Sequence, residues 1–140
     1  MPDIAPAQEL RLSFVEMQAN RWFYEREKLR IFPAFALLAV NGQITAAEGG
    51  LDTQYGNTYG IRIGLEGYPY SLPRVFPKGW TLHPNATHKY VDGSLCIMRS
   101  DQWRREFTVA LVVAKTAIWL GKYELWKRNG HVWPGLGQRH

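Results

Sequence analysis

Apolar residues recur at helical spacing over the first part of the chain. They fall on one face of a helix, whereas the charged residues lie mostly elsewhere. Pro6 suits the first turn of a helix, and Pro33 stops propagation beyond Phe32. The pattern therefore predicts one long amphipathic helix over Pro6–Leu29 that lies on an apolar surface. Its apolar face comprises Leu12, Val15, Ala19, Trp22 and Leu29.

After Pro33 the helical spacing gives way to short runs that turns separate. Asn41-Gly42 is a strong hairpin signal, because both residues tolerate the positive φ of a type I′ turn. Gly49-Gly50 and Tyr55–Asn57 mark two further turns. We therefore predict an antiparallel meander of three or four short strands, which after a helix is an α+β pattern. The strands that the sequence indicates directly are 35–40, 43–47 and 59–65.

Regular periodicity disappears over Gly67–Gln102, a stretch that four prolines interrupt. Such a long segment without elements of its own is usually either functional or disordered. This one carries too many large apolar residues for disorder. We predict an ordered loop that packs on the core, and the only cysteine of the chain lies inside it.

The last part of the chain predicts two helices and an irregular tail. Thr108 is a suitable N-cap for a helix that is apolar on nearly every side, which is typical of a core helix. Gly121 follows Leu120 and predicts the end of that helix. A shorter helix over Tyr123–Arg128 should follow, and residues 131–140 show no regular pattern.

Composition narrows the class of protein. The chain has 140 residues, of which 46% are hydrophobic and 21% charged, and this globular composition fits a single domain over residues 1–140. The longest strongly apolar run, Val109–Leu120, contains Lys115 and is shorter than the roughly 20 residues that cross a bilayer. The first residues carry no secretory signal, and one cysteine suits a reducing compartment. We therefore expect a cytoplasmic protein with no membrane partner.

The charge balance favours an acidic partner. Seventeen Lys and Arg oppose twelve Asp and Glu, which gives a net charge of +5. A nucleic-acid-binding domain is therefore one alternative. It is disfavoured because the basic residues are spread from Arg11 to Arg139 without forming a stripe, and because the aromatic residues fall at core spacings.

Three short motifs occur in order along the predicted loop. Tyr68-Pro69 opens it, His83-Pro84-Asn85 follows, and Gly93-Ser94-Leu95-Cys96 precedes Trp103. In this order, with a helix and a meander before them and helices after them, the motifs resemble those of the ubiquitin-conjugating enzyme (UBC) family. The resemblance covers roughly Leu10–Arg128.

The resemblance implies a UBC-like fold with an N-terminal helix, a four-stranded antiparallel meander, a long active-site loop and C-terminal helices. It implies that Cys96 accepts the C-terminus of a ubiquitin-like protein from an activating enzyme, as a thioester. The acyl group would then pass to a lysine amine of an acceptor protein. The asparagine of the family motif corresponds to Asn85, which implies stabilisation of the oxyanion or shaping of the loop.

The residue types fit this chemistry. An unperturbed cysteine, with a pKa of about 8.5, is only a few per cent thiolate at neutral pH. That fraction suffices because the incoming acyl group is already activated as a thioester, so no His-Asp relay is required. A positioned amide such as Asn85 could contribute about 3 kcal/mol to oxyanion stabilisation. We expect His83 to support the loop, and Asp101 is a candidate to orient or deprotonate an amine.

The end of the chain indicates a subgroup. Residues 123–135 resemble the ends of bacterial stand-alone conjugating-enzyme-like proteins from anti-phage CBASS operons, which are built around a cGAS-like nucleotidyltransferase. In that subgroup the conjugated chain is the C-terminus of the nucleotidyltransferase, so the resemblance implies this donor or a ubiquitin-like protein. The sequence departs from the family at Met98, where an aspartate is common, and at Arg105, where the usual Trp-x-Pro has proline.

Other interpretations of the same residues stay open. Cys96 could be a buried apolar thiol, and the chain a non-catalytic UBC-fold binding module. Asn85 could bond only the local backbone, as asparagine does in turns. The four histidines are scattered and the one cysteine offers no zinc spacing, so we expect neither a metal nor another cofactor.

Overall fold

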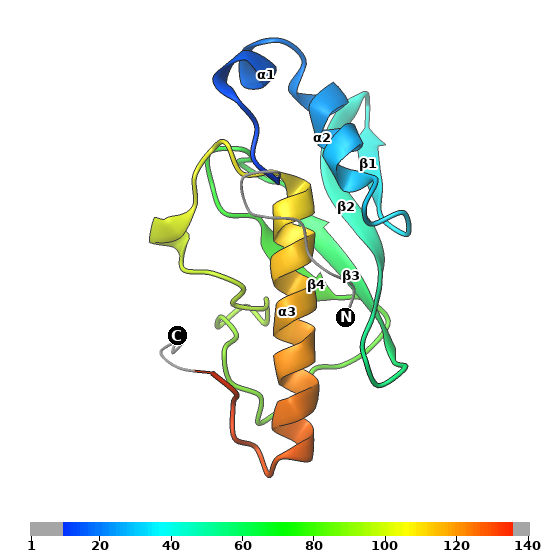
Figure 1. The fold of residues 1–140 in the computed structure, drawn as a ribbon, viewed down its shortest axis with the longest axis vertical. Coiled ribbons are helices and arrows are strands. Elements are labelled where there is room, and N and C mark those ends of the chain that lie inside the picture. Colours follow the sequence, from blue (N-terminus) through cyan, green and yellow to red (C-terminus); the bar gives the residue numbers. More distant parts are fainter. Residues whose placement is uncertain (1–9, 136–140) are drawn as a thin grey trace.

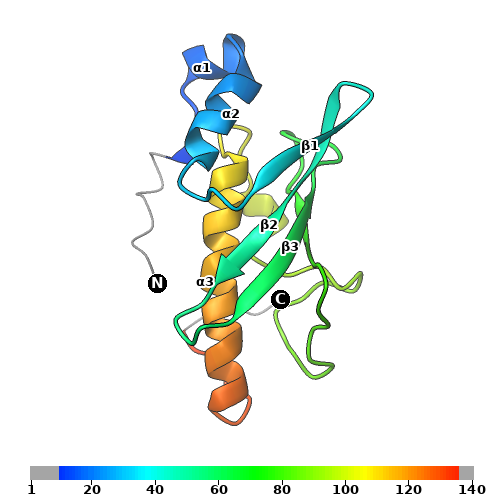
Figure 2. The ribbon, with the colours of Figure 1, turned by 90° about the vertical axis from the view of Figure 1, so that its right-hand side faces the viewer.

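The computed structural model describes residues 10–135, which form an α+β fold. Its one sheet is antiparallel, with strand order β1-β2-β3-β4. Helix α3 lies along one face of the sheet, and α1 and α2 gather at the end where α3 begins (Figures 1 and 2). The elements are α1 (Phe14–Gln18), α2 (Arg21–Leu29), β1 (Ala36–Val40), β2 (Gln43–Asp52), β3 (Thr58–Gly64), β4 (Arg74–Pro77), η2 (Ser100–Gln102) and α3 (Val109–Arg128).

The prediction of one long N-terminal helix is wrong, because the chain forms two short helices there. Ser13 and Glu16 form a capping box that starts α1, in which the Glu16 N–H donates to Ser13 Oγ at 3.1 Å. Asn20 caps α2 by accepting from the Phe23 N–H at 3.2 Å. Two capping residues within the predicted helix therefore divide it. The start of that prediction, residues 6–9, lies outside the described residues.

The predicted meander is present, but β2 is longer than expected and continues through Gly49-Gly50. These glycines were predicted to turn the chain. Gly49 instead pairs with Ile61 of β3, and a Cβ placed on it would lie 2.6 Å from the Phe35 ring. The glycine therefore permits close packing of a side chain on the strand. The fourth strand, β4, lies within the segment predicted as a loop and pairs Val75 with Ile63.

The two predicted C-terminal helices are one helix, α3, which passes through Gly121. Its predicted N-cap is confirmed, since Thr108 Oγ1 accepts from the Leu111 N–H at 3.1 Å. A glycine within a helix costs only about 1 kcal/mol. Here the residues around it, Trp119, Leu120 and Tyr123, are buried in the core, so tertiary packing overrides the local preference.

Most of α3 is buried. Twelve of its twenty residues are buried, and they form the core together with side chains of the sheet and the long loop. Within residues 10–135, no helix combines the length and the apolar character that a membrane span requires.

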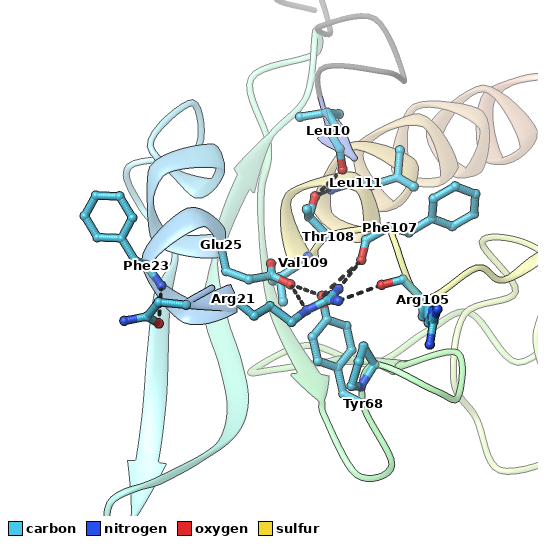
Figure 3. Close-up of polar contacts among 12 residues, drawn as sticks. Leu10, Arg21, Phe23, Glu25, Tyr68, Arg105, Phe107, Thr108, Val109 and Leu111 are labelled. Atoms are coloured by element: carbon cyan, nitrogen blue, oxygen red, sulfur yellow. Dashed lines mark hydrogen bonds and ion pairs between the residues drawn. The ribbon is translucent and has the colours of Figure 1, made fainter. Parts of the chain in front are cut away.

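A buried carboxylate fixes α2 to the start of α3 (Figure 3). Glu25 is fully buried, and its Oε1 accepts from the Val109 N–H at 2.9 Å. Its Oε2 accepts from Arg21 Nε at 3.0 Å and from the Tyr68 hydroxyl. The Arg21 guanidinium also donates to the Phe107 carbonyl at 2.7 Å. Burial raises the pKa of Glu25, and the hydrogen bond from Tyr68 opposes that shift.

A second buried carboxylate lies near the other end of α3. Glu124 is 1% exposed, and its Oε2 accepts from Asn57 Nδ2 and, at 3.2 Å, from the Tyr59 hydroxyl. Among the described residues, nothing hydrogen-bonds to its Oε1. Burial, and then the neighbouring Glu124, raise the pKa of Tyr59 to about 12.

Candidate functional site

Cys96 follows a narrow turn between β4 and η2. Lys89 and Leu95 form an isolated antiparallel bridge, and the Tyr90 N–H donates to the Ser94 carbonyl at 2.8 Å. Gly93 takes a φ of 88°, which the reversal requires and glycine adopts without strain. Asp92 Oδ1 accepts from both the N–H and the hydroxyl of Ser94, and this hydroxyl is the main cause of the lowered pKa of Asp92.

Two backbone hydrogen bonds fix the cysteine segment in the fold. The Leu95 N–H donates to the Val75 carbonyl of β4 at 2.8 Å. The Cys96 N–H donates to the His88 carbonyl at 2.9 Å. Strand β4, at the edge of the sheet, therefore holds the cysteine segment on one side, and the backbone of residue 88 holds it on the other.

The thiol itself is covered. Cys96 is 2% exposed, and its Sγ lies 3.8 Å from the Met98 carbonyl oxygen. The Tyr90 hydroxyl donates to the same carbonyl at 2.8 Å, which places the phenol beside the sulfur. Burial raises the pKa of the Cys96 thiol, and Tyr90 opposes that shift by hydrogen bonding. The resting group at neutral pH is therefore a protonated thiol.

Asn85 lies in the same loop and is exposed. Its backbone N–H donates to His83 Nδ1 at 3.0 Å. In the part of the chain that the structure describes, no hydrogen bond joins its side-chain amide to Cys96 or to any other residue. The structure thus leaves the amide open to solvent and does not bring it to the thiol.

His83 and Asp101 occupy different surroundings. The His83 N–H donates to the Tyr123 hydroxyl at 2.9 Å, and its ring meets Trp126 edge-on at 5.3 Å. These contacts fasten the loop to α3. Asp101 is exposed in η2 and pairs with Arg99 at 3.2 Å, and no hydrogen bond or ion pair joins it to Cys96 within the described residues.

Several residues around the thiol were missed at the level of sequence. They are His88, Tyr90, Trp119 and Trp133. The Asp92-Gly93 pair is a hairpin signal that could have placed Tyr90 near the cysteine. No local pattern predicts that Trp133, far along the chain, stacks on His88 at 4.3 Å.

Between Leu10 and Gly135, no three His, Cys, Asp or Glu side chains come together as metal ligands would. The chemical groups gathered around residue 96 are a thiol, a phenol and backbone amides. This arrangement can carry acyl chemistry on sulfur once the sulfur is uncovered.

Comparison with known families identifies the family to which the chain belongs. A family model described as type II CBASS E2 protein matches residues 25–140, most of the chain. The chain belongs to this family. A search of curated proteins finds no match. As a type II CBASS E2 protein, the chain has a conjugation-related role in anti-phage defence and acts with other CBASS proteins. The matched range includes the whole loop around Cys96.

Proposed function

We propose that Cys96 carries an acyl group as a thioester and transfers it to an amine. In the first step the Cys96 thiolate attacks the thioester carbonyl of an activated protein C-terminus, the new S–C bond forms, and the thiol of the activating enzyme leaves. In the second step an acceptor amine attacks the same carbonyl carbon, an amide forms, one proton is released, and Cys96 leaves as thiolate. The enzyme is therefore a conjugating transferase of the cytoplasm.

The observation that carries this proposal is the placement of the one cysteine. A type II CBASS E2 protein is expected to act through a nucleophile, and Cys96 is the only cysteine in the chain. Leu95 and Cys96 are each held by a backbone hydrogen bond, which gives the sulfur a defined position at the end of β4. Holding a nucleophile in one geometry is a main source of rate in acyl transfer.

The proposal includes a conformational step. The sulfur is 2% exposed in this structure, so an acyl donor reaches it only after a covering side chain moves. Tyr90 is the group to move, since its hydroxyl and the thiol share the Met98 carbonyl. Exposure also removes the burial that raises the pKa of Cys96, so the thiolate fraction increases toward that of an unperturbed cysteine as the site opens.

The acyl donor in this proposal is the C-terminus of a cGAS-like nucleotidyltransferase or of a ubiquitin-like protein. The CBASS family membership supports the first, and the general resemblance to conjugating enzymes supports the second. An excess of five positive charges assists encounter with an acidic donor. Transfer to a protein lysine completes the reaction.

The experiment mixes the protein with the other proteins of its operon and an activating enzyme, and separates the products without reductant. We expect an adduct that dithiothreitol cleaves in the wild type and no adduct in Cys96→Ala. Cys96→Ser should give an adduct that resists dithiothreitol, because an oxyester replaces the thioester. An adduct that persists in Cys96→Ala would contradict the assignment.

Asn85 is proposed to support the transfer step. Its amide is unpaired and exposed, so it is available to a tetrahedral oxyanion once substrate is bound. Asn85→Ala should slow single-turnover discharge to an amine by about 100-fold and leave the melting temperature nearly unchanged. Thr81→Ala, at an exposed residue of the same loop, is the control. Discharge at the wild-type rate in Asn85→Ala would leave only a loop-shaping role.

The burial of the thiol favours a second candidate, a binding module that performs no acyl transfer. The two functions differ in what Cys96→Ala does. A binding module would retain its affinity for the nucleotidyltransferase and its protective effect against phage in Cys96→Ala, whereas the transferase would lose protection.

A further inference from the structure

The segment after α3 reverses direction and runs back along the active-site loop (Figure 1). Gly130 and His131 take φ values of 67° and 68°, and the His131 N–H donates to the Trp126 carbonyl at 2.9 Å. This 6→1 bond with left-handed residues is a Schellman ending, which commonly brings the residue after the turn against the last turn of the helix. The His131 ring accordingly stacks on Trp126 at 4.0 Å and 8°.

Two rings of this segment pack on the two histidines that flank Asn85. His131 lies 5.0 Å from His83, ring centre to ring centre. Trp133 stacks on His88 at 4.3 Å and 11°, and its other neighbour is Trp119 at 5.3 Å. The Trp133 indole N–H is buried and has no hydrogen-bond partner among the described residues, so ring packing is what holds this side chain.

His88 connects the segment to the nucleophile. Its carbonyl accepts from the Cys96 N–H and from Trp119 Nε1, both at 2.9 Å. Its backbone takes a φ of 61°, a conformation that residues other than glycine adopt only when the surroundings hold them there. Trp119 fixes the carbonyl and Trp133 fixes the ring, so the residue that places Cys96 is itself held on both sides.

We propose that Trp133 is a positioning residue for Cys96, acting through His88. Residues 129–135, here named the C-terminal clamp, hold the segment of residues 83–88 between themselves and α3, and thereby hold the backbone that places the sulfur. That this positioning of Cys96 assists acyl transfer rests on the proposed function. Whether Trp133 holds Cys96 in position can be measured on the protein alone, without any partner.

The proposal predicts opposite effects on two reactions of the same thiol. A small alkylating reagent needs only access, so loosening residue 88 should speed its reaction with Cys96. A protein donor needs the sulfur in one orientation, so the same loosening should slow thioester formation. A residue that only covered the thiol would speed both reactions.

The test uses the sole cysteine as its own reporter. Iodoacetamide labelling of Cys96 in native buffer should be about 3- to 10-fold faster in Trp133→Ala than in the wild type, in proportion to the loss of one aromatic stack. Trp133→Phe keeps a ring on His88 and should restore a rate within about twofold of the wild type. Val132→Ala, at an exposed neighbour in the same segment, should leave the rate unchanged.

A second control separates positioning from general loss of stability. Trp22→Ala removes an indole from α2, where it packs on Tyr68 at 5.7 Å, beside the start of α3 and not at the end that the clamp follows. Cys96 of this variant should react with iodoacetamide at the wild-type rate.

In Trp133→Ala the increase in the labelling rate should depend only weakly on urea concentration, as expected for a local opening. The NMR signals of the His88 ring should also lose the upfield shift that a parallel indole causes.

Several results would overturn the proposal. Labelling of Trp133→Ala at the wild-type rate would show that the clamp does not hold Cys96, and equal labelling of Trp133→Ala and Trp22→Ala would show only general destabilisation. Faster thioester formation in Trp133→Ala would reduce Trp133 to a cover. The labelling experiment requires no partner. If no donor loads the wild type, that result counts against the proposed function, and labelling still decides whether the clamp holds Cys96.

Discussion

Two buried glutamates, Glu25 on α2 and Glu124 on α3, have similar neighbours and different degrees of hydrogen bonding. Each accepts from a tyrosine hydroxyl. Both oxygens of Glu25 are satisfied, by a guanidinium, a phenol and the first N–H of α3, whereas within residues 10–135 only one oxygen of Glu124 accepts a hydrogen bond. Near Glu124 the cation Lys127 donates to the Tyr59 hydroxyl at 3.3 Å.

The difference shows how the two ends of α3 are attached to the rest of the fold. At its start, directional hydrogen bonds from one carboxylate join α2, the helix and the segment before it. At its end, ring stacking joins the loop and the clamp to the helix. Breaking a saturated polar cluster leaves several groups unpaired at once, whereas ring contacts can be lost one at a time. The end with the clamp, which contacts the thiol segment through His88, is therefore the end that can open locally.

The largest effect should come from Glu25→Ala. It leaves the Arg21 guanidinium, which is 13% exposed, without its carboxylate and the Val109 N–H without an acceptor. We expect the free energy of unfolding to fall by about 3–5 kcal/mol, measured by urea denaturation. Glu27→Ala, in an exposed pair with Arg30, is the control and should cost less than about 1 kcal/mol. Equal losses in the two variants would contradict the comparison.

Asn57→Ala should have a smaller effect at the other end. It removes the amide donor from Glu124 and, among the described residues, leaves the Tyr59 hydroxyl as the remaining donor to that carboxylate. We expect a loss of about 1.5–3 kcal/mol in the free energy of unfolding, the usual range for a hydrogen bond to a charged group. Gln54→Ala, exposed in the same turn, should change stability by less than about 0.5 kcal/mol. If Asn57→Ala lowered the free energy of unfolding as much as Glu25→Ala does, the two carboxylates would contribute equally to stability, which would contradict the comparison.

Glu25→Gln removes the ionisable group at this position and keeps its size, so it tests how burial shifts the pKa of Glu25. Burial raises the pKa of Glu25 above the ordinary 4.5, so the folded state binds this proton more tightly than the unfolded chain does. The contribution of this tighter proton binding to the free energy of unfolding is complete below the pKa that Glu25 has in the unfolded chain. It is lost as the pH rises through the pKa of Glu25 in the folded state. The stability of the wild type relative to Glu25→Gln should therefore decline as the pH rises above about 4.5, in urea titrations at several pH values. A relative stability that increases with pH would contradict the direction of the shift.

The smallest effect should come from Gly121→Ala, in the part of α3 that joins the two ends. A Cβ there meets nothing within 4 Å and the residue is helical, so the substitution should raise the free energy of unfolding by about 0.5–1 kcal/mol. Gly42→Ala is the matched control, since its Cβ also meets nothing but its φ is +78°. Thermal denaturation should show the opposite sign for Gly42→Ala. A destabilised Gly121→Ala would indicate a bend in α3.

Local patterns predicted those elements whose signals are local. The hairpin at Asn41-Gly42 and the cap at Thr108 are both present where expected. The break in the N-terminal helix was also encoded locally, in Ser13 and Asn20, but the regular spacing of apolar residues concealed it. Gly49 and Gly121 were both misread as breaks in an element. Gly49 admits the Phe35 ring, a contact that the sequence does not reveal, whereas a Cβ on Gly121 would meet nothing within 4 Å and α3 simply continues through it.

The candidate site was predictable in its parts and not in its arrangement. Motif order located Cys96, Asn85 and His83 in one loop, and the structure places them there. That the thiol is covered depends on Tyr90, Met98 and the hydrogen bond to His88, and among the described residues no hydrogen bond joins Asn85 to the thiol. These are tertiary contacts between segments whose pairing no single-sequence pattern specifies.

The hydrogen bond from Leu95 to Val75 bears on how this loop can vary in length. It fixes the position of Cys96 beside β4, whatever the number of residues that separate Cys96 from Asn85. Doubling a flexible connection costs only about 0.6 kcal/mol, so insertions and deletions at exposed positions between β4 and His88 can be absorbed at the surface. The spacing between the Asn85 amide and the thiol can therefore change before residue 88, while the His88 carbonyl and the Lys89–Leu95 bridge keep the sulfur where it is.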